Sequence, residues 1–515
     1  MPPRQRQNPN EITNTPTGYQ ILRFHQRRAQ GKGLGLAAGL QKLRPMKFRL
    51  HLFVLPMLIA VLNLMPADRV TAQIFTTLHS FAFDGDGAYP YSGLVLAGNT
   101  LYGTAVAEGG GNDTVFAVNI DGTGFTNLHR FGGSNRALLY SGLFLSGNTL
   151  YGVAAQGGSS SNGAVFAVNT DGTGFTNLYS FTNDWSSGVG FPYAGLILSG
   201  NTLYGTAAAG GVFAVDTDGT GFRSLHSFTA GNYDSAGYYT NSDGDYSYAV
   251  LLLSGDTLYG TAYEGGGSGG GTVFAMNTNG TGFTIVHNFS RESTNSSGVY
   301  THSDGGFPHA GLILLGNTLY GTAADGGSSG NGTVFAVNIN GTGFRTLHSF
   351  TGSDGDGPWA ALISSGNTLF GTTVFGGSSG YGTVFTINTD GTGFTNLFSF
   401  NGPGGGIFPY AGLVLSGNTL YGTASDYLSD PNLGTVFSLS FRPQLTIASS
   451  GPNVILSWPT NVGGFDCSGF NLQSTSNLIS STIWSTNSPA PVVVNGQKTV
   501  AAAISSQRRF YRISK

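Results

Sequence analysis

The sequence predicts an all-β fold: a seven-bladed β-propeller of four-stranded blades closed by the N-terminal strand, followed by a small β-sandwich. Three observations predict it. The octapeptide GNTLYGTA at residues 98–105 recurs seven times with small changes. Each copy lies in a unit of about 50 residues that divides into four strand-like runs. One fourth run is missing from the end of the repeats, and a matching segment stands at their beginning.

The first unit, residues 91–131, shows how each element is predicted. GLVLAG alternates, and Gly-Asn then forms a two-residue hairpin turn into TLYGTA. A Gly-rich loop leads to TVFAVN, and DGTG turns the chain into FTNLHRF. Four antiparallel strands make one propeller blade.

The spacing of the repeats favours a propeller over a β-helix. The aromatic residue of the octapeptide recurs at intervals of 49 to 61 residues, close to the kelch period, whereas a coil of a parallel β-helix is about half as long. These positions are Tyr102, Tyr151, Tyr204, Tyr259, Tyr320, Phe370 and Tyr421.

The ends of the repeat region predict how the propeller closes. The run that follows DGTG or NGTG occurs six times, and the seventh unit stops at residues 435–440 without it. The segment IFTTLHSF at residues 74–81 matches the missing run. We therefore expect it to be the outer strand of the last blade, where it pairs an otherwise exposed sheet edge.

The repeat resembles a known family. The pattern GNTLYGTA, GTVFAVNTDGTGF and TNLHSF is similar to the GloVer tandem repeat of exported bacterial proteins described as choice-of-anchor, over roughly residues 74–440. The resemblance implies a secreted or surface protein with a C-terminal anchoring module. This chain departs from that pattern, because it ends in RRFYRISK without a hydrophobic tail or sortase-like motif. A looser similarity to kelch repeats concerns geometry alone.

The N-terminal segment predicts export. Residues 46–72 read as a signal peptide, with Lys47 and Arg49 before an apolar run and cleavage after Ala72. Residues 1–45 are a basic extension, so either Met1 or Met46 is the start. We expect an extracellular, periplasmic or cell-surface protein, without a membrane span in the mature chain.

The charge and the cysteine content limit the partners and the crosslinks that we expect for this chain. From Gln73 onward the chain has 11 basic and 23 acidic residues, so it should repel nucleic acid. Cys467 is the only cysteine, which excludes an internal disulfide and suggests a packed side chain. We expect a monomer.

Residues 442–515 follow the predicted propeller of residues 73–441 and give about six strand-like runs. VILSWP and FYRIS resemble strands of a fibronectin type III-like sandwich. The unit is either a spacer or a module that attaches to glycan or to a surface.

A candidate ligand site lies on one face of the predicted propeller. The blade-to-blade loops vary in length, and they share that face with the Gly-rich loops. One aromatic or imidazole side chain precedes each innermost strand, and it serves either as a packing wedge between blades or as a stacking surface for sugars. The set comprises Tyr91, Tyr140, Tyr193, Tyr248, His309, Trp359 and Tyr410.

Acidic pairs in Gly-rich loops are candidate Ca²⁺ ligands, although neither EF-hand nor RTX spacing is complete, and no cofactor is otherwise expected. They are Asp84, Asp86, Asp243, Asp245, Asp354 and Asp356. Tyr300, His302 and Asp304 are candidate acid and base groups in one loop. Five histidines at one position of the outer strand, where Tyr179 and Phe398 also occur, indicate packing.

Three functions remain open. No nucleophile elbow, zinc-protease motif or Walker loop occurs, which favours a non-catalytic binding or adhesion module, with glycan or cell-surface material as the expected partner. The second is an extracellular carbohydrate-active lyase or hydrolase that uses the loop at residues 300–309. The third is a purely structural surface protein.

Overall fold

The computed structural model describes residues 72–82, 85–107, 112–132, 137–182, 190–208, 210–235, 237–294, 298, 300–402, 406–426, 433–476, 484–486, 489–503 and 509–514. The predicted leader before Ala72 lies outside these ranges. Two compact units divide between Ser440 and Phe441. The described residues contain strands and no helix, and hence no helix that could cross a membrane.

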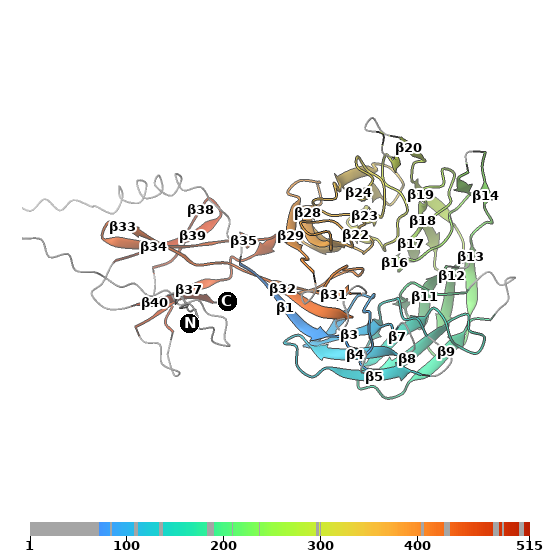
Figure 1. Cartoon of the computed structure of the whole chain (residues 1–515), viewed down its shortest axis with the longest axis horizontal. Coiled ribbons are helices and arrows are strands. Elements are labelled where there is room, and N and C mark those ends of the chain that lie inside the picture. Colours follow the sequence, from blue (N-terminus) through green and yellow to red (C-terminus); the bar gives the residue numbers. More distant parts are fainter. Residues whose placement is uncertain are drawn as a thin grey trace, which may run out of the picture. The chain divides into compact units, whose positions relative to one another are not determined.

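The first unit contains seven four-stranded sheets in the part of the chain that the structure describes, and Figure 1 shows them around a common centre. In six sheets the four strands follow one another in sequence order. The first sheet comprises β2 (Val95–Ala97), β3 (Thr100–Ala105), β4 (Asp113–Asn119) and β5 (Thr126–Phe131), with each pair antiparallel. The prediction of an all-β fold with four-stranded antiparallel sheets is confirmed.

Five further sheets repeat this order. They are β6 (Phe144–Ser146), β7 (Thr149–Ala154), β8 (Ala164–Asn169) and β9 (Thr176–Ser180); β10 (Ile197–Ser199), β11 (Thr202–Ala207), β12 (Gly211–Asp216) and β13 (Arg223–Ser227); β16 (Leu252–Ser254), β17 (Thr257–Ala262), β18 (Thr272–Asn277) and β19 (Thr284–Asn288); β22 (Ile313–Leu315), β23 (Thr318–Ala323), β24 (Thr333–Asn338) and β25 (Arg345–Ser349); and β26 (Ile363–Ser365), β27 (Thr368–Thr373), β28 (Thr383–Asn388) and β29 (Thr395–Ser399). Two hairpins extend the longest loops: β14 (Asn232–Tyr233) with β15 (Tyr239–Thr240), and β20 (Glu292–Thr294) with β21 (Tyr300–His302).

The last sheet combines both ends of the repeat region. Its order is β1 (Ala72–Ser80), β32 (Gly434–Arg442), β31 (Thr419–Ser425) and β30 (Val414–Ser416). The amide of Phe81 donates to the carbonyl of Gly434 at 2.9 Å, as the amide of Phe181 donates to that of Gly163 at 3.0 Å in the second sheet. Strand β1 therefore holds the place that the fourth strand takes in the other sheets.

The octapeptide has a packing reason at almost every position. Its first glycine has a φ near +60° in all seven copies, which opens the hairpin turn, and its leucine is fully buried. Its second glycine lies under a phenylalanine of the third strand: a Cβ atom at Gly205 would come within 2.6 Å of the ring of Phe213. The Thr206 hydroxyl donates to the carbonyl of Ala249, in the segment that enters the next sheet, at 3.1 Å.

Neighbouring sheets are joined by ring stacking. The outer-strand position predicted as packing holds a His, Tyr or Phe, and this ring lies within 7° of parallel to a Phe of the next sheet in every case. The centroid distances are His79–Phe125 3.5 Å, His129–Phe175 3.6 Å, Tyr179–Phe222 3.9 Å, His226–Phe283 3.8 Å, His287–Phe344 3.7 Å, His348–Phe394 3.6 Å and Phe398–Phe75 4.6 Å.

The innermost strands are shorter than the sequence suggests. GLVLAG was expected to pair throughout, but β2 spans only Val95–Ala97. The chain is crowded before these strands begin, since a Cβ atom at Gly142 or Gly195 would lie 3.2 Å from a carbonyl oxygen of the preceding sheet. Close approach to a neighbouring backbone thus replaces ladder pairing near the centre.

The second unit is also all-β. One sheet has the order β33 (Thr446–Ser450), β34 (Asn453–Pro459), β39 (Gln497–Ala503) and β38 (Val492–Val494), and smaller pairs form from β37 (Asn471–Thr475) with β40 (Phe510–Ser514) and from β35 (Asn461–Val462) with β36 (Phe465–Asp466). Trp458 from β34 and Leu472 from β37 share one core. Cys467 is buried, as expected.

The role of β1 in the last sheet can be tested by truncating a buried side chain. Phe81, directly after β1, is fully buried and packs with residues of the first and last repeats, whereas Ile74 on β1 is 41% exposed. We expect Phe81→Ala to lower the free energy of unfolding by about 3–5 kcal/mol and Ile74→Ala by less than about 1 kcal/mol. Chemical denaturation measures both, and equal small effects would show that β1 does not contribute to this core.

Candidate functional site

The seven predicted aromatic and imidazole side chains form a circle of contacts, here called the aromatic circle. Each ring contacts the next, and the last contacts the first; all seven are half-buried. The centroid distances are Tyr91–Tyr140 5.6 Å, Tyr140–Tyr193 5.7 Å, Tyr193–Tyr248 5.7 Å, Tyr248–His309 5.1 Å, His309–Trp359 5.5 Å, Trp359–Tyr410 5.6 Å and Tyr410–Tyr91 5.2 Å. The sequence thus identified a set of residues that the fold brings together.

A backbone turn precedes most members of the aromatic circle. The residue two positions earlier has a positive φ in six units, and in five of them it is bulky and apolar or aromatic, which is uncommon for such residues. They are Leu138, Phe191, Tyr246, Phe307 and Phe408. The turn places several of these rings beside the circle: Tyr246 stacks on Tyr248 at 6.3 Å, and Phe307 stacks on Tyr263 at 5.1 Å.

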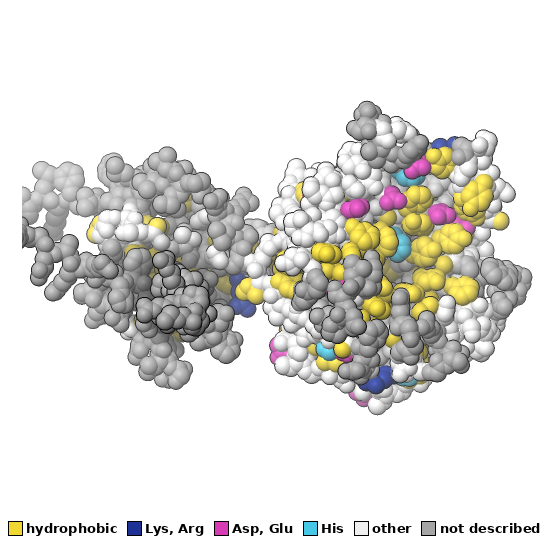
Figure 2. Space-filling model, in the orientation of Figure 1, with side chains coloured by type: hydrophobic (Ala, Val, Ile, Leu, Met, Phe, Trp, Pro, Cys, Tyr) yellow, Lys and Arg dark blue, Asp and Glu magenta, His cyan; other side chains and the backbone are white. Residues whose placement is uncertain are grey.

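Acidic side chains lie among these aromatic residues. Figure 2 shows hydrophobic side chains, tyrosines included, gathered in the middle of the first unit, with Asp and Glu side chains beside them. The backbones of Asp245 and Glu264 exchange hydrogen bonds of 2.8 and 3.2 Å. Burial raises the pKa of Glu264, and the charge of Asp245 adds to the effect. Burial likewise raises the pKa of Asp325 and of Asp356. The charged forms of these three carboxyl groups are therefore disfavoured by their surroundings.

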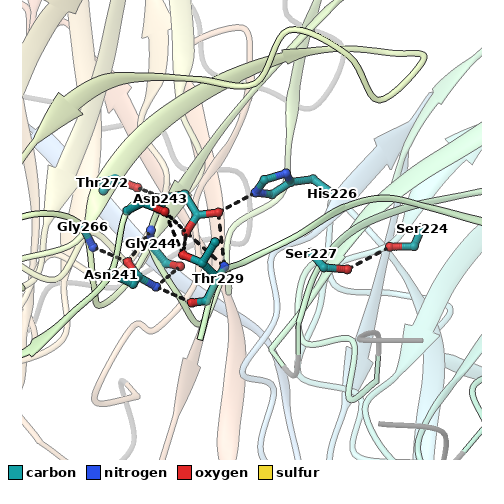
Figure 3. Close-up of polar contacts among 10 residues, drawn as sticks. Ser224, His226, Ser227, Thr229, Asn241, Asp243, Gly244, Gly266 and Thr272 are labelled. Carbon is teal, nitrogen blue, oxygen red and sulfur yellow. Dashed lines mark hydrogen bonds and ion pairs between the residues drawn. The ribbon is translucent and has the colours of Figure 1, made fainter. Parts of the chain in front are cut away.

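A polar clasp anchors the loop that carries Tyr248 (Figure 3). The carboxylate of Asp243 contacts Nε2 of His226 at 2.9 Å and accepts hydrogen bonds from the amide and hydroxyl of Thr229. Asn241 donates to the carbonyls of Thr229 and Gly244 at 3.0 and 2.7 Å. The outer strand and both ends of the loop are thereby tied together.

Three other loops have the same clasp, with an aspartate five residues before the member of the aromatic circle. The contacts are His79–Asp86, His287–Asp304 and His348–Asp354, each 3.0 Å. Burial lowers the pKa of His79 and of His348 despite the nearby carboxylates. Burial opposes ionisation of Asp304, but hydrogen bonds from His287 and Ser290 outweigh it and lower its pKa.

The structure separates the candidate calcium ligands. Asp86, Asp243 and Asp354 belong to clasps, whereas Asp245 accepts a hydrogen bond from the Tyr239 hydroxyl at 2.8 Å. Asp84 lies outside the described residues. Within the ranges that the structure describes, no group of three His, Cys, Asp or Glu residues could hold a metal ion.

The candidate acid and base groups of the loop at residues 300–309 also lie in different surroundings. Asp304 contacts His287, while His302 lines a different place, a cavity of about 190 Å³ together with Glu292 and Asp325. Tyr300 lies in β21, and its side chain is outside the described residues. A larger cavity of about 370 Å³ lies beside His129, and none of the predicted site residues lines it.

Sequence reasoning missed the clasp, although the chain carries a signal for it. Where the aspartate is present, the outer strand has His; where Gly188 or Gly405 stands in its place, the outer strand has Tyr179 or Phe398. His129 is the exception, because Asn135 stands at the position of the aspartate in its loop. Reading the two positions together would have paired these residues.

The repeated sheets and the circle of rings at their inner ends define an all-β, propeller-like repeat protein. The sequence model of the Gloeobacter/Verrucomicrobia repeat matches residues 68–211 and 297–482, which is more than half of the chain. The chain belongs to this family, and the resemblance to the GloVer repeat is confirmed.

Comparisons with other proteins add fold similarity alone. No curated protein matches the sequence. Among solved structures, BamB from Moraxella catarrhalis has 12% identity and a TM-score of 0.40, covering 72% of this chain and 100% of that one. An oligogalacturonate lyase in complex with manganese has 11% identity and a TM-score of 0.43, covering 73% and 95%. TolB from Acinetobacter baumannii has 15% identity and a TM-score of 0.33, covering 56% and 60%.

The surroundings of His309 predict a specific acid sensitivity. Burial lowers the pKa of His309 to about 4, below its ordinary value of 6.5. As the pH falls below 6.5 the unfolded chain takes up this proton first, so stability is lost between pH 6.5 and 4, by up to about 3 kcal/mol. His309→Tyr, which installs the residue found at five equivalent positions, should reduce the loss. Melting temperatures at pH 7 and pH 4.5 check this, and identical shifts in both proteins would contradict it.

The clasp predicts a second effect on stability. Asp243→Ala removes the partner of His226 and the acceptor of Thr229, and the aspartate side chain is almost fully buried. We expect it to cost about 1–3 kcal/mol. The matched control Asp218→Ala lies in an exposed turn and should cost clearly less than Asp243→Ala. Urea denaturation compares the two variants. If the control loses as much stability as Asp243→Ala, Asp243 does not anchor the loop.

Proposed function

We propose that residues 73–441 form a closed seven-bladed propeller in which β1 completes the last blade. The contacts between the first and last repeats support this. The Thr423 hydroxyl donates to the carbonyl of Ser92 at 2.9 Å, the bond that Thr206 makes to the next sheet. Tyr410 and Tyr91 are in contact within the aromatic circle. Phe75 of β1 stacks on Phe398 of the sheet before it.

The propeller carries a binding or adhesion function outside the cytoplasm, for glycan or other cell-surface material. The leader pattern in residues 46–72 supports export. The observation that carries the binding function is the aromatic circle: seven contiguous rings, each half-buried, on inner segments that come directly after the variable loops.

The chemistry of this surface suits sugars. Aromatic faces stack on the apolar faces of sugar rings, and nearby carboxylates accept hydrogen bonds from hydroxyl groups. Tyr246 presents such a face, since it is 41% exposed and stacks on Tyr248. The clasps hold the loop bases in place before a ligand arrives, which lowers the entropy cost of binding.

An enzyme is a second candidate, favoured by one observation. His302 and Asp325 line the same small cavity, and an imidazole beside a carboxylate can move a proton. The third candidate, a structural protein without a ligand, is favoured by the contact that every member of the aromatic circle makes with both neighbours.

Glycan-array binding of the full chain tests the proposal. Trp359→Ala should weaken binding by about 2- to 10-fold for each lost stack while the circular dichroism spectrum stays unchanged. Tyr233→Ala is the matched control, because Tyr233 is 76% exposed on hairpin β14–β15 and lies outside the circle. The control should bind as the parent does.

Other outcomes separate the three candidates. The protein is an enzyme and not a binding module if it releases products from a polysaccharide panel, if Trp359→Ala leaves this release intact and if His302→Gln abolishes it. A blank array together with a blank substrate panel would replace it by a structural protein.

A further inference from the structure

The cavity beside β21 is lined by hydrogen-bond acceptors. Its side chains are those of Glu292, Thr301, His302, Phe307 and Asp325, so no lysine or arginine lines it among the residues described. The hydroxyl of Thr301 already donates to the carbonyl of Gly327 at 2.6 Å. One imidazole and two carboxylates are the remaining polar side chains.

The orientation of His302 makes its free ring nitrogen an acceptor. Nδ1 lies 2.6 Å from the carbonyl oxygen of Ser290, which can only accept, so Nδ1 carries the hydrogen. Nε2 is then left with a lone pair. It is buried and has no hydrogen-bond partner among the described residues, and only 3% of the residue is exposed. An unpaired buried acceptor costs stability unless a ligand donates to it.

Packing holds the imidazole in this orientation. A Cβ atom at Gly306 would lie within 2.6 Å of its ring carbon Cγ, and one at Gly270 would lie 3.1 Å from Nδ1. Phe307 packs edge-on against the ring at 4.9 Å. The glycines therefore form a slot that fits the imidazole and fixes where Nε2 lies.

The carboxylates are also placed by their surroundings. The backbone of Asp325 exchanges hydrogen bonds of 2.9 and 3.1 Å with Gly306, beside the slot. Burial raises the pKa of Asp325, and the negative charges of Asp356 and Glu292 act in the same direction, while His302 opposes them. Glu292 accepts from the Tyr238 hydroxyl at 3.4 Å, and Arg291 lies over the Tyr238 ring rather than in the cavity lining.

We propose that this cavity binds a primary ammonium group carried by an amino sugar of the glycan, an inference that rests on the proposed glycan-binding function. A primary ammonium has three N–H donors and one positive charge, which match the imidazole lone pair and two carboxylates. Hydrogen bonds to nitrogen span about 2.7–3.2 Å, longer than bonds to a metal ion. Among the described residues, no group of three His, Cys, Asp or Glu side chains could hold a metal ion, so the proposal concerns an ammonium and not a metal.

One residue of the cavity lining is linked to the aromatic circle by ring contacts. Phe307, which lines the cavity, stacks on Tyr263 at 5.1 Å. Tyr263 contacts both Tyr248 and His309 edge-on, at 5.7 and 6.0 Å. In this inference, a sugar chain stacked at Tyr248 and His309 directs its amino substituent toward the cavity.

The direct test uses n-propylammonium and n-propanol, which differ in charge and donors but share a propyl chain. Proton–carbon NMR of the full chain follows the imidazole signal of His302, assigned by its loss in His302→Gln. We expect propylammonium to shift the signal and propanol to leave it in place. Asp325→Asn should abolish the shift, whereas Asp390→Asn, in an exposed turn on another part of the unit, should preserve it.

A second measurement separates this inference from the proposed function. Calorimetry compares oligomers of glucosamine and of N-acetylglucosamine at pH 6, where the free amines are protonated, and we expect the glucosamine oligomer to bind at least about 10-fold more tightly. Asp325→Asn should remove that preference, and Trp359→Ala should weaken both. Equal binding of the two oligomers without a propylammonium shift overturns the ammonium site and leaves glycan binding intact. If propylammonium shifts the His302 signal but neither oligomer binds, the cavity binds ammonium groups and the assignment of glycan as the ligand is overturned. A preference that survives Asp325→Asn reflects the overall acidic charge and overturns the inference.

Discussion

The stack of an outer-strand ring on a phenylalanine of the next sheet is the contact on which the first unit depends. Backbone hydrogen bonds hold the four strands of each sheet together, and side-chain contacts join the faces of neighbouring sheets. The stack of His226 on Phe283 closes the outer side of one such junction, and the hydroxyl of Thr206 closes the inner side. A sheet with two apolar faces is stable only between neighbours, so the octapeptide has to recur in every unit.

The junction explains why the histidines look structural and yet have polar partners. The imidazole replaces Tyr179 or Phe398 as a flat ring for stacking, and its edge nitrogen reaches an aspartate that a phenyl ring could not hold. One residue thus serves both the contact between sheets and the anchoring of a loop. Three of the aspartates that resemble calcium ligands in the sequence, Asp86, Asp243 and Asp354, anchor loops in this way.

Strand order, the place of β1 and the members of the aromatic circle were predictable because they depend on periodicity, which a single sequence with internal repeats displays. The cavity around His302 was not, because it has no counterpart in the other units. Its carboxylates come from two separate segments, and Asp325 stands where Phe375 stands in the next unit. Nothing periodic marks such a site, and the separation of His302 from Asp304 follows from hairpin β20–β21, whose register the sequence does not display.

The aromatic circle is not uniform. Seven identical tyrosines would offer a bound molecule seven equivalent orientations. His309 and Trp359 are adjacent, so they remove that degeneracy and give the circle one distinct sector. A polymer lying across it would meet different side chains in its two directions, and the circle therefore has the asymmetry needed to distinguish one end of a chain from the other.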